Sequence, residues 1–494
     1  MFLQVKLTGD FFVPKLYKIA LIYQLLPLEN NIFCIYMLVF EGDYMQPSLT
    51  PLQPKIKRRK NKLYISINKK FVFSHLISVA WLAFSFYFSL PWLEDLSAII
   101  SLPLGIIVIG GIAYVPGYMN AFLVMSLLLD RQPPFKNQQP NDDITLLVAA
   151  FNEEESIFQT LSYVADQDYE GKINVIVIDN HSSDRTYEQL IKAQKELPLD
   201  IHILKEPLPG KFHALNKGLL HVTTRYVITL DADTLLHPSA VRFLVSRMES
   251  SPANVGAVAG SMLVRNSRDN IWTKIQEWDY YLGIASIKRL QGLYQGTLVA
   301  QGAFSLYKTE CVRQVGGWPN AIGEDIVLTW RLLQKGWRVY FEPLAAAFTD
   351  VPSNLPHFAK QRSRWARGMI EGLSEIKPWN QPQLYTKYLT GVNFVMPYLD
   401  IVYTFFWLPG LVLAFFGYYW IVGPMTLFVL PLTVLNYGIL YFYKKQYVFK
   451  NLNLKVRKNA IGFILFILCY QMIMSPISVW GYYQELFKLK RVWK

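Results

Sequence analysis

The longest stretches without a charged residue lie towards the two ends of the chain, on either side of a more polar middle. Residues 71–90 contain no Asp, Glu, Lys or Arg, and residues 96–129 form a second such stretch. About 20 apolar residues cross the hydrocarbon core of a bilayer, and helices of soluble proteins rarely stay uncharged for this length. We therefore predict two transmembrane helices within residues 71–130, joined by a short turn at residues 91–95.

The C-terminal part of the chain has the same character. Two candidate spans fill residues 391–443, divided near Gly423, and a last candidate runs from residue 460 to about residue 483. We predict two to three transmembrane helices over residues 391–485, and their parity stays open because basic segments flank the last candidate on both sides. The composition agrees, since 52% of the chain is hydrophobic and only 17% is charged, against roughly 25% charged residues in soluble proteins.

Basic residues cluster immediately before the first predicted span, at Lys55, Lys57, Arg58, Arg59, Lys60 and Lys62. Such residues favour the cytoplasmic side of a membrane, so two spans return the chain to the cytoplasm and the polar middle is predicted to be cytoplasmic. The net charge of +13 is then explained mainly by segments that face anionic lipid. We therefore predict a multi-pass protein of the cell (inner) membrane, in contact with the lipid bilayer, and no nucleic acid partner.

Residues 1–70 precede the first predicted span and form an N-terminal segment. Residues 11–40 are apolar but are interrupted by prolines and charges, a pattern that suits neither a signal peptide nor a clean span. Our hypothesis is that Met45 is the native start and that residues 1–44 do not belong to the native protein.

The middle, residues 141–387, is predicted to be an α/β domain. Short apolar strands alternate with helical stretches, with strands at 144–150, 173–179, 201–204 and 226–230 and helices at 154–167, 186–196 and 212–220. This alternation predicts a parallel sheet covered on both faces, with ligands bound at the carboxyl ends of its strands. The three cysteines lie far apart and the seven histidines lack ligand spacing, which argues against a disulfide framework or a structural metal site. The phosphate-binding glycine motifs of ATPases and dehydrogenases are absent from the sequence.

One pair of acidic residues follows a predicted strand directly. Asp231 and Asp233 end the strand at residues 226–230, and alternate residues of a strand point to the same side. Two carboxylates on one side repel each other unless a cation lies between them. Oxygen ligands favour Mg²⁺ or Mn²⁺, ions that proteins often share with a diphosphate.

Two motifs lie further along the chain. Glu324 and Asp325 are suited to the first turn of a helix, which favours acids. Residues 361–373 combine Trp365, basic residues and apolar residues at helical spacing, which predicts an amphipathic helix at the membrane face. An arginine here also suits a pyrophosphate group, because a guanidinium binds two of its oxygens at once.

Taken in order, these motifs resemble those of the processive family 2 glycosyltransferases, which include the poly-N-acetylglucosamine, cellulose, chitin and hyaluronan synthases. The motifs are Phe151-Asn152-Glu153-Glu154, Asp179, Lys211, Asp231-Ala232-Asp233, Glu324-Asp325 and Gln361-x-x-Arg364-Trp365. The resemblance covers most of the chain after about residue 60. It implies a Rossmann-like GT-A domain, of the α/β class, inserted between N- and C-terminal transmembrane helices. It also implies an inverting enzyme that transfers a sugar from a UDP-sugar to a growing polysaccharide and helps to export it.

The resemblance implies a role for each matching residue. The donor would be bound by Asn152, Glu154, Asp179 (at the uracil), Lys211 (at the phosphates), Asp231 (at the ribose or metal) and Arg364 (at the diphosphate). Asp233, with Asp231, would ligate Mg²⁺ or Mn²⁺. Asp325 would be the general base, with Glu324 beside it. Gln361 and Trp365 would bind the acceptor, and the indole would stack on its sugar ring.

This sequence departs from the family pattern at two places. Gly323 replaces the usual threonine before Glu-Asp, and Asp179-Asn180-His181-Ser182 replaces the usual Asp-Asp-Gly-Ser. The layout favours the poly-β-1,6-N-acetylglucosamine synthases and UDP-N-acetylglucosamine as donor. Another processive synthase, a non-processive transferase acting on a lipid or short glycan, and a transporter or scaffold with an inactive domain are the alternatives. Small membrane or export subunits are possible partners.

Overall fold

The computed structural model describes residues 65–489, except residues 132, 424–425, 427–429 and 456–457. The chain separates into two compact units, and the first, Met1–Gln46 with Val456–Ala460, lies almost wholly outside the described residues. The following description concerns the second unit, Pro47–Lys455 with Ile461–Lys494. The predicted start at Met45 and the basic cluster at residues 55–62 also lie outside the described residues.

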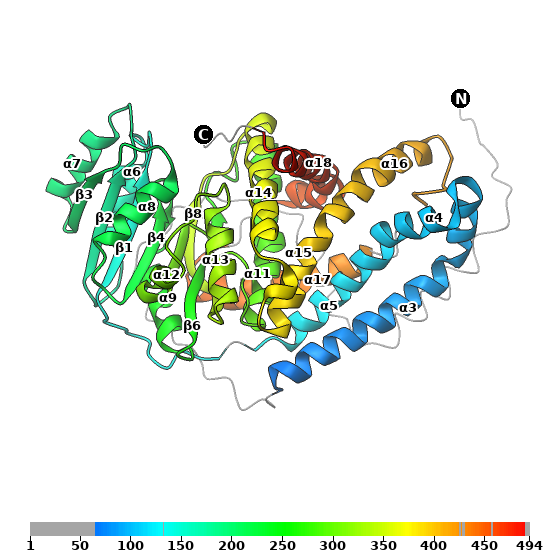
Figure 1. The fold of residues 1–494 in the computed structure, drawn as a ribbon, viewed down its shortest axis with the longest axis horizontal. Helices are drawn as coiled ribbons and strands as arrows, with labels where there is room; N and C mark the ends of the chain where they lie inside the picture. The colour runs from blue at the N-terminus through cyan, green and yellow to red at the C-terminus, as the bar shows by residue number, and fades with distance from the viewer. Residues whose placement is uncertain (1–64, 132, 424–425, 427–429, 456–457, 490–494) are drawn as a thin grey trace, which may run out of the picture. The chain divides into compact units, whose positions relative to one another are not determined.

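Four helices in the described part of the chain are long and apolar enough to cross a membrane. They are Ile67–Ile100 (α3), Leu102–Leu129 (α4 Leu102–Ile109, η1 Gly110–Tyr114 and α5 Val115–Leu129), Leu384–Phe415 (α15 Leu384–Val402, η4 Tyr403–Trp407 and α16 Leu408–Phe415) and Ala460–Leu486 (α18) (Figure 1). In three of them only 17% of the most apolar stretch is buried, which leaves apolar side chains for lipid.

The predicted turn at residues 91–95 is wrong. Pro91 lies inside α3, and the chain turns only at Ser101, whose φ of 122° ends the helix. Near the other end, α17 (Leu430–Tyr443) continues into a π-helix, η6 (Lys444–Phe449), and is not among the four candidate spans.

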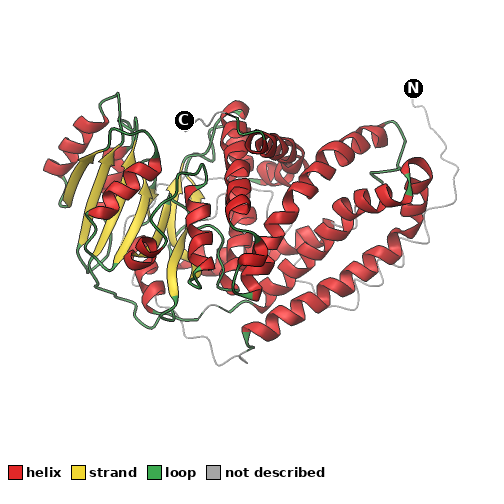
Figure 2. Ribbon diagram, in the orientation of Figure 1, coloured by secondary structure: helices red, strands yellow, loops and turns green. Residues whose placement is uncertain are grey.

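The central domain is built on one eight-stranded sheet with the order β3-β2-β1-β4-β7-β6-β8-β5. Figure 2 shows the strands in yellow. The strands are β1 Ile144–Ala150, β2 Ile173–Asp179, β3 Asp200–Lys205, β4 Tyr226–Asp231, β5 Leu235–Leu236, β6 Val255–Val264, β7 Phe304–Lys308 and β8 Arg338–Thr349. The four strands predicted from the sequence pair in parallel, as expected. The sheet as a whole is mixed, because β7 runs antiparallel to both β4 and β6.

Helices cover both faces of this sheet, and the side chains of its strands enter two different hydrophobic cores. In β1, Leu146 and Val148 belong to one core and Leu147 to the other. The helices of the domain are α6 Ile157–Ala165, α7 Thr186–Glu196, α8 Lys211–Leu220, α9 Ala240–Glu249, α10 Ile271–Trp278, η2 Asp279–Ile284, α11 Ala285–Leu293, α12 Thr309–Gln314, α13 Glu324–Gln334, α14 Leu355–Glu375 and η3 Pro378–Asn380. The predicted helices at 186–196 and 212–220 correspond to α7 and α8, and that at 154–167 to the shorter α6.

Helix α14 joins the central domain to the last candidate span. Arg367 of α14 donates to Glu485 of α18 at 3.0 Å and to the carbonyl of Leu489. The two helices also touch through backbone, since a Cβ at Gly481 would lie 2.5 Å from the carbonyl oxygen of Ser363. The segment 361–373, predicted to be an amphipathic helix, therefore lies within α14 and packs against an apolar helix.

Candidate active site at the carboxyl edge of the sheet

The polar strand ends predicted from the sequence meet at one edge of the sheet. Ala150 of β1 pairs in register with Asp179 of β2, and Ala149 pairs with Asp231 of β4. The residues after these three strands are therefore neighbours in space, which is the arrangement that parallel strands give to a ligand site.

The turn after β1 is built by Asn152 and Glu154. Asn152 has a φ of 54°, a conformation that asparagine tolerates better than most residues, and its Oδ1 accepts from the backbone N–H of Ser183 at 2.8 Å. The carboxylate of Glu154 accepts from the N–H of Arg185 at 2.9 Å. Both side chains thus bind the turn after β2 and fix the two strand ends to each other.

Asp179 is buried at the end of β2, and its Oδ1 accepts from the N–H of Ser182. The next residue, Asn180, has a structural task that the sequence did not reveal. Its amide donates to the carbonyl of Leu208 at 2.6 Å, and its Oδ1 accepts from the N–H of Gly210 at 2.8 Å. Asn180 therefore holds the loop that leads into α8 and places Lys211 at the first position of that helix.

Lys211 lies between two predicted site carboxylates. Its Nζ is 2.6 Å from Asp231 Oδ1 and 3.5 Å from Glu324 Oε1. A lysine is unfavourable at a helix N-terminus, and here Asp231 and Glu324 compensate. Burial opposes the charge of Lys211, but the two carboxylates outweigh burial and raise its pKa. Gly302 lets the ammonium come this close, because a Cβ there would lie 2.7 Å from Nζ.

Glu324 and Asp325 begin α13 and face this cluster. Burial, opposed by Lys211, raises the pKa of Glu324 to about 7. Asp325 Oδ2 accepts from the N–H of Gly302 at 3.1 Å, and its Oδ1 accepts from the N–H of Ile326 at 2.8 Å. These two contacts fix the carboxylate of Asp325 beside the loop that borders Lys211. A second lysine, Lys288 of α11, feels the charge of Asp325, although burial lowers its pKa to about 8.

Of the two aspartates of the predicted metal site, Asp231 is the last residue of β4 and Asp233 lies two residues after it. The side chain of Asp233 is exposed. The surrounding protein nevertheless displaces water from its carboxyl group, and this desolvation, followed by the charges of Asp231 and Glu153, raises the pKa of Asp233 to about 6. This repulsion is relieved by a cation, and carboxylate oxygens are suitable ligands for Mg²⁺ or Mn²⁺. Among the described residues, groups of three or more His, Cys, Asp or Glu that could hold a metal are absent. The two carboxylates therefore have the chemistry that the ligands of such an ion need.

Helix α14 carries the third set of predicted residues. Trp365 is partly exposed, and its ring lies 6.4 Å from that of Tyr280. Burial raises the pKa of Tyr280, whose hydroxyl also feels the charges of Asp233 and Arg364. The Oε1 atom of Gln361 is buried and has no hydrogen-bond partner among the residues that the structure describes. Tyr280, which the sequence did not single out, thus lies beside Trp365 of the α14 motif and feels the charge of Asp233.

The most buried member of this motif is Arg362, to which the sequence gave no role. Its guanidinium donates to Asp279 at 2.9 Å and lies 3.9 Å above the ring of Trp365. Asp279 also accepts from the hydroxyl of Tyr470 in α18 at 2.7 Å. Burial raises the pKa of Asp279 while Arg362 opposes the shift. The buried contacts of Asp279 with Arg362 and Tyr470 connect α14, η2 and α18. The guanidinium of Arg362 also packs against the ring of Trp365.

The structure thus brings Lys211, Asp231, Asp233, Glu324 and Asp325 into one cluster. The side chains of Asn152, Glu154 and Asp179 bind the turn beside it. Gln361, Arg364 and Trp365 lie on α14, which carries a separate part of the predicted site.

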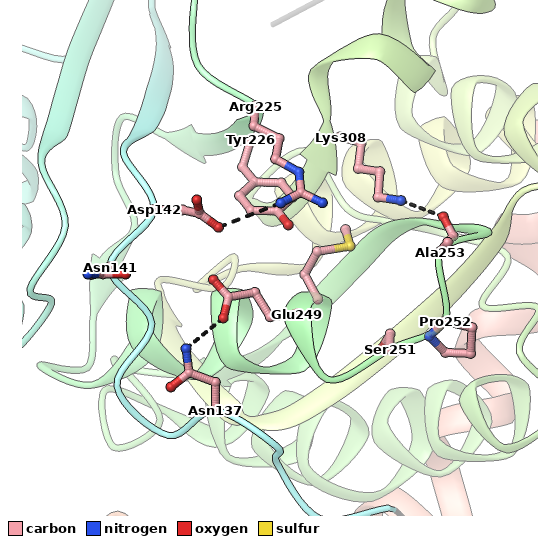
Figure 3. Close-up of a pocket in the computed structure, with 11 residues that line it drawn as sticks. Asn137, Asn141, Asp142, Arg225, Tyr226, Glu249, Ser251, Pro252, Ala253 and Lys308 are labelled. Atoms are coloured by element: carbon pink, nitrogen blue, oxygen red, sulfur yellow. Dashed lines mark hydrogen bonds and ion pairs between the residues drawn. The ribbon is translucent and has the colours of Figure 1, made fainter.

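A separate pocket of about 330 Å³ lies at the opposite edge of the sheet (Figure 3). It is lined by residues before β1 and at the start of β4, among them Asp142, Arg225 and Tyr226, and by Glu249 of α9. Arg225 and Asp142 are 3.9 Å apart, and Glu249 accepts from Asn137 at 2.8 Å. Since the strands β1 and β4 begin here, this pocket is distinct from the site at their carboxyl ends.

Residues 140–368 match a family model described as "Glycosyltransferase like family 2". The central domain belongs to glycosyltransferase family 2. This confirms the family inferred from the motifs. The family 2 domain also has curated relatives, among them the poly-beta-1,6-N-acetyl-D-glucosamine synthases of Staphylococcus aureus, 37% identical over 246 residues, and of Staphylococcus epidermidis, 33% identical over 264 residues.

These alignments cover 50% and 53% of this chain and 58% and 63% of the two relatives, so the chain matches about three fifths of their length. Among solved structures, a mannosyltransferase of Pyrobaculum calidifontis in complex with GDP-Man and Mn²⁺ is similar with a TM-score of 0.54 at 17% identity. That likeness covers 81% of this chain and 100% of the mannosyltransferase. It confirms the predicted GT-A fold of the family 2 domain, which apolar helices flank on both sides.

Proposed function

We propose that the protein is a membrane-embedded, inverting and processive glycosyltransferase. It transfers N-acetylglucosamine from UDP-N-acetylglucosamine to a growing poly-β-1,6-N-acetylglucosamine chain and helps to export that chain. The observation that carries the proposal is the cluster at the carboxyl edge, where Lys211 lies between Asp231 and Glu324 and next to the fixed carboxylate of Asp325. The similarity to the staphylococcal synthases supports the sugar and the linkage.

On the acceptor side, Asp325 is the general base. Its carboxylate takes the proton of the acceptor hydroxyl while that oxygen attacks C1 of the donor sugar, and the bond from C1 to UDP breaks. Two backbone N–H groups hold this carboxylate in place, so little reorganisation accompanies the transfer. Gln361 and Trp365 bind the acceptor, and the partly exposed indole offers a flat face to its sugar ring.

On the donor side, the departing UDP carries the negative charge. Lys211 and Arg364 bind the diphosphate, while Asn152, Glu154 and Asp179 form the turn that receives the nucleoside. Asp231 and Asp233 hold Mg²⁺ or Mn²⁺, which supplies further positive charge to the diphosphate when bound. Glu324 sets the position of the Lys211 ammonium, because the two groups are 3.5 Å apart.

The four candidate spans make this a membrane protein. We propose that the family 2 domain lies on the cytoplasmic side of the cell (inner) membrane, where UDP-sugars are made. Export subunits in the same membrane would receive the polymer. The contact between α14 and α18 supports this arrangement, since it holds the acceptor motif against an apolar helix.

The test is turnover of a panel of UDP-sugars by the purified protein in lipid, followed by sizing and linkage analysis of the product. The expected product is a long β-1,6-linked polymer formed from UDP-N-acetylglucosamine with Mg²⁺ or Mn²⁺. A product with a different sugar or linkage would contradict the assignment of poly-β-1,6-N-acetylglucosamine as the polymer. A product with one added sugar would refute processivity. If every UDP-sugar remains unconsumed, the enzymatic proposal is wrong.

A further inference from the structure

The two residues before α13, whose first turn carries both predicted catalytic acids, are bound by a residue from another helix. The N-cap position of α13 is Gly323, whose hydrogen side chain cannot accept a hydrogen bond. The N–H groups of Ile322 and Gly323 donate to Glu371 Oε2 of α14, at 2.7 and 3.1 Å. One carboxylate oxygen thus receives two backbone N–H groups immediately before Glu324.

The same two elements touch through their backbones. A Cβ on Gly323 would lie 2.7 Å from the Cα of Gly368, and a Cβ on Gly368 would lie 2.8 Å from the Cα of Gly323. This packing explains the first departure from the family pattern, because a threonine at position 323 has no space beside α14 in this structure. The two glycines let Glu371, one turn further along α14, reach the start of α13.

Glu371 is 9% exposed, so its charge is largely shielded from water. A carboxylate in such a place is stabilised by the N–H groups that it accepts and by the positive end of a helix dipole. Both are supplied here by the start of α13. The contact therefore depends on the negative charge of Glu371 as well as on its length.

We propose that Glu371 is a positioning residue that sets Glu324 and Asp325 relative to the acceptor motif of α14. This inference rests on the proposed function. Gln361 and Trp365 lie on the same rigid helix as Glu371, so the Glu371 carboxylate links the group that holds the acceptor to the base that deprotonates it. Glu371 does not touch the reacting atoms and acts through the backbone of residues 322 and 323.

The experiment compares Glu371→Ala and Glu371→Gln with a matched control, Glu375→Gln. Glu375 lies one turn further along α14 and also contacts α13, through Arg331, but its side chain is 40% exposed. Each variant is assayed in lipid for kcat and for the KM of UDP-N-acetylglucosamine. Hydrogen–deuterium exchange of the peptide covering residues 318–330 gives a second measurement that does not need turnover.

We expect Glu371→Ala to lower kcat about 100-fold, as misplacement of a reacting group by about 1 Å does, with the KM of the donor changed less than about twofold. Glu371→Gln keeps an oxygen acceptor without the charge, so its kcat lies between wild type and Glu371→Ala. Hydrogen–deuterium exchange at residues 322 and 323 should be slowest in wild type, faster in Glu371→Gln and fastest in Glu371→Ala. Glu375→Gln should match wild type in all three measurements.

Unchanged exchange at residues 322 and 323 in Glu371→Ala would overturn the inference, whatever happens to turnover. An unchanged kcat in Glu371→Ala would also overturn the inference. A KM of the donor that rises in parallel with the loss of kcat would overturn it too, because such a rise indicates a general loss of structure. If Glu371→Ala does not fold, Glu371→Gln decides by the same criteria. Failure of wild type to consume any UDP-sugar refutes the proposed function instead, and the exchange result then still decides whether Glu371 fixes the start of α13.

Discussion

Replacement of Lys211 by methionine tests the centre of the candidate site. Methionine keeps most of the length of the side chain but removes the ammonium that is 2.6 Å from Asp231 and 3.5 Å from Glu324. The side chains of Lys211 and Glu324 are only 18% and 12% exposed, so water replaces the lost charge poorly. Two carboxylates then face each other at the edge of the sheet.

The magnitude follows from the pKa of Glu324, which burial raises to about 7 despite the opposing charge of Lys211. An opposite charge at about this distance lowers the pKa of a carboxyl group by about 1–3. Loss of the lysine should therefore raise the pKa of Glu324 by about one to two pH units. The carboxyl group of Glu324 should therefore stay protonated to higher pH in Lys211→Met than in wild type.

The sign for stability follows from proton uptake. Because folding raises the pKa of Glu324 above its usual value of 4.5, the folded state binds more protons between about pH 4.5 and 7. The contribution of Glu324 to stability is present below this window and is lost as the pH rises through about 7. In Lys211→Met the loss should continue to higher pH, so thermal unfolding in lipid at pH 6 and pH 8 should differ more than in wild type.

The activity assay is polymer synthesis across pH 6–9. If Lys211 stabilises the departing diphosphate as proposed, its loss should lower kcat/KM about 100-fold. Lys217→Met is the control, because Lys217 lies on the same helix and its ammonium pairs with Glu206 at 3.5 Å. Wild-type activity in Lys211→Met, or an equal loss in Lys217→Met, would refute the reasoning.

Three further predictions follow from contacts at the same site. Asp325→Asn should abolish polymer synthesis while binding of UDP, measured by calorimetry, stays within about twofold; unchanged turnover would remove Asp325 as the base. Arg362→Ala leaves the buried Asp279 without its cation and should lower the free energy of unfolding by about 3–5 kcal/mol, whereas Tyr470→Phe removes one hydrogen bond and should cost about 1–2 kcal/mol; equal denaturation midpoints for the two variants would contradict this. Chelation of divalent ions should stop synthesis, and Asp233→Asn should raise the Mn²⁺ concentration needed to restore it; restoration at an unchanged concentration would exclude Asp233 as a ligand.

The first half of the sheet could be predicted because each of its strands is a short apolar run that ends in polar residues. The predicted strands at 144–150 and 173–179 coincide with β1 and β2, and the parallel register then brings Asp179 and Asp231 to one edge. The second half could not be predicted in this way. A long helical segment precedes β7. The sequence of the five residues of β7 does not indicate that this strand enters the sheet antiparallel to β4.

The α14 motif illustrates a different limit. Residues two apart on a helix point about 200° away from each other, so Arg362 and Arg364 cannot serve the same face. The motif pattern identifies Arg364, but only the packing reveals that Arg362 is buried against Asp279. Glu371 was missed for a related reason, since its partners are backbone N–H groups and leave no trace in side-chain patterns.

The π-helix η2 constrains the number of residues between Asp279 and Arg289. It lies within one continuous helical segment, between α10 and α11, and its first residue is Asp279. On the α11 side, Arg289 forms a buried ion pair with Asp130, just after the second candidate span. Removal of one residue from η2 would restore α geometry and rotate one half against the other by about 100°. Either the pair with Arg362 or the pair with Asp130 would then be lost, so relatives that keep both pairs should show neither insertion nor deletion between positions 279 and 289.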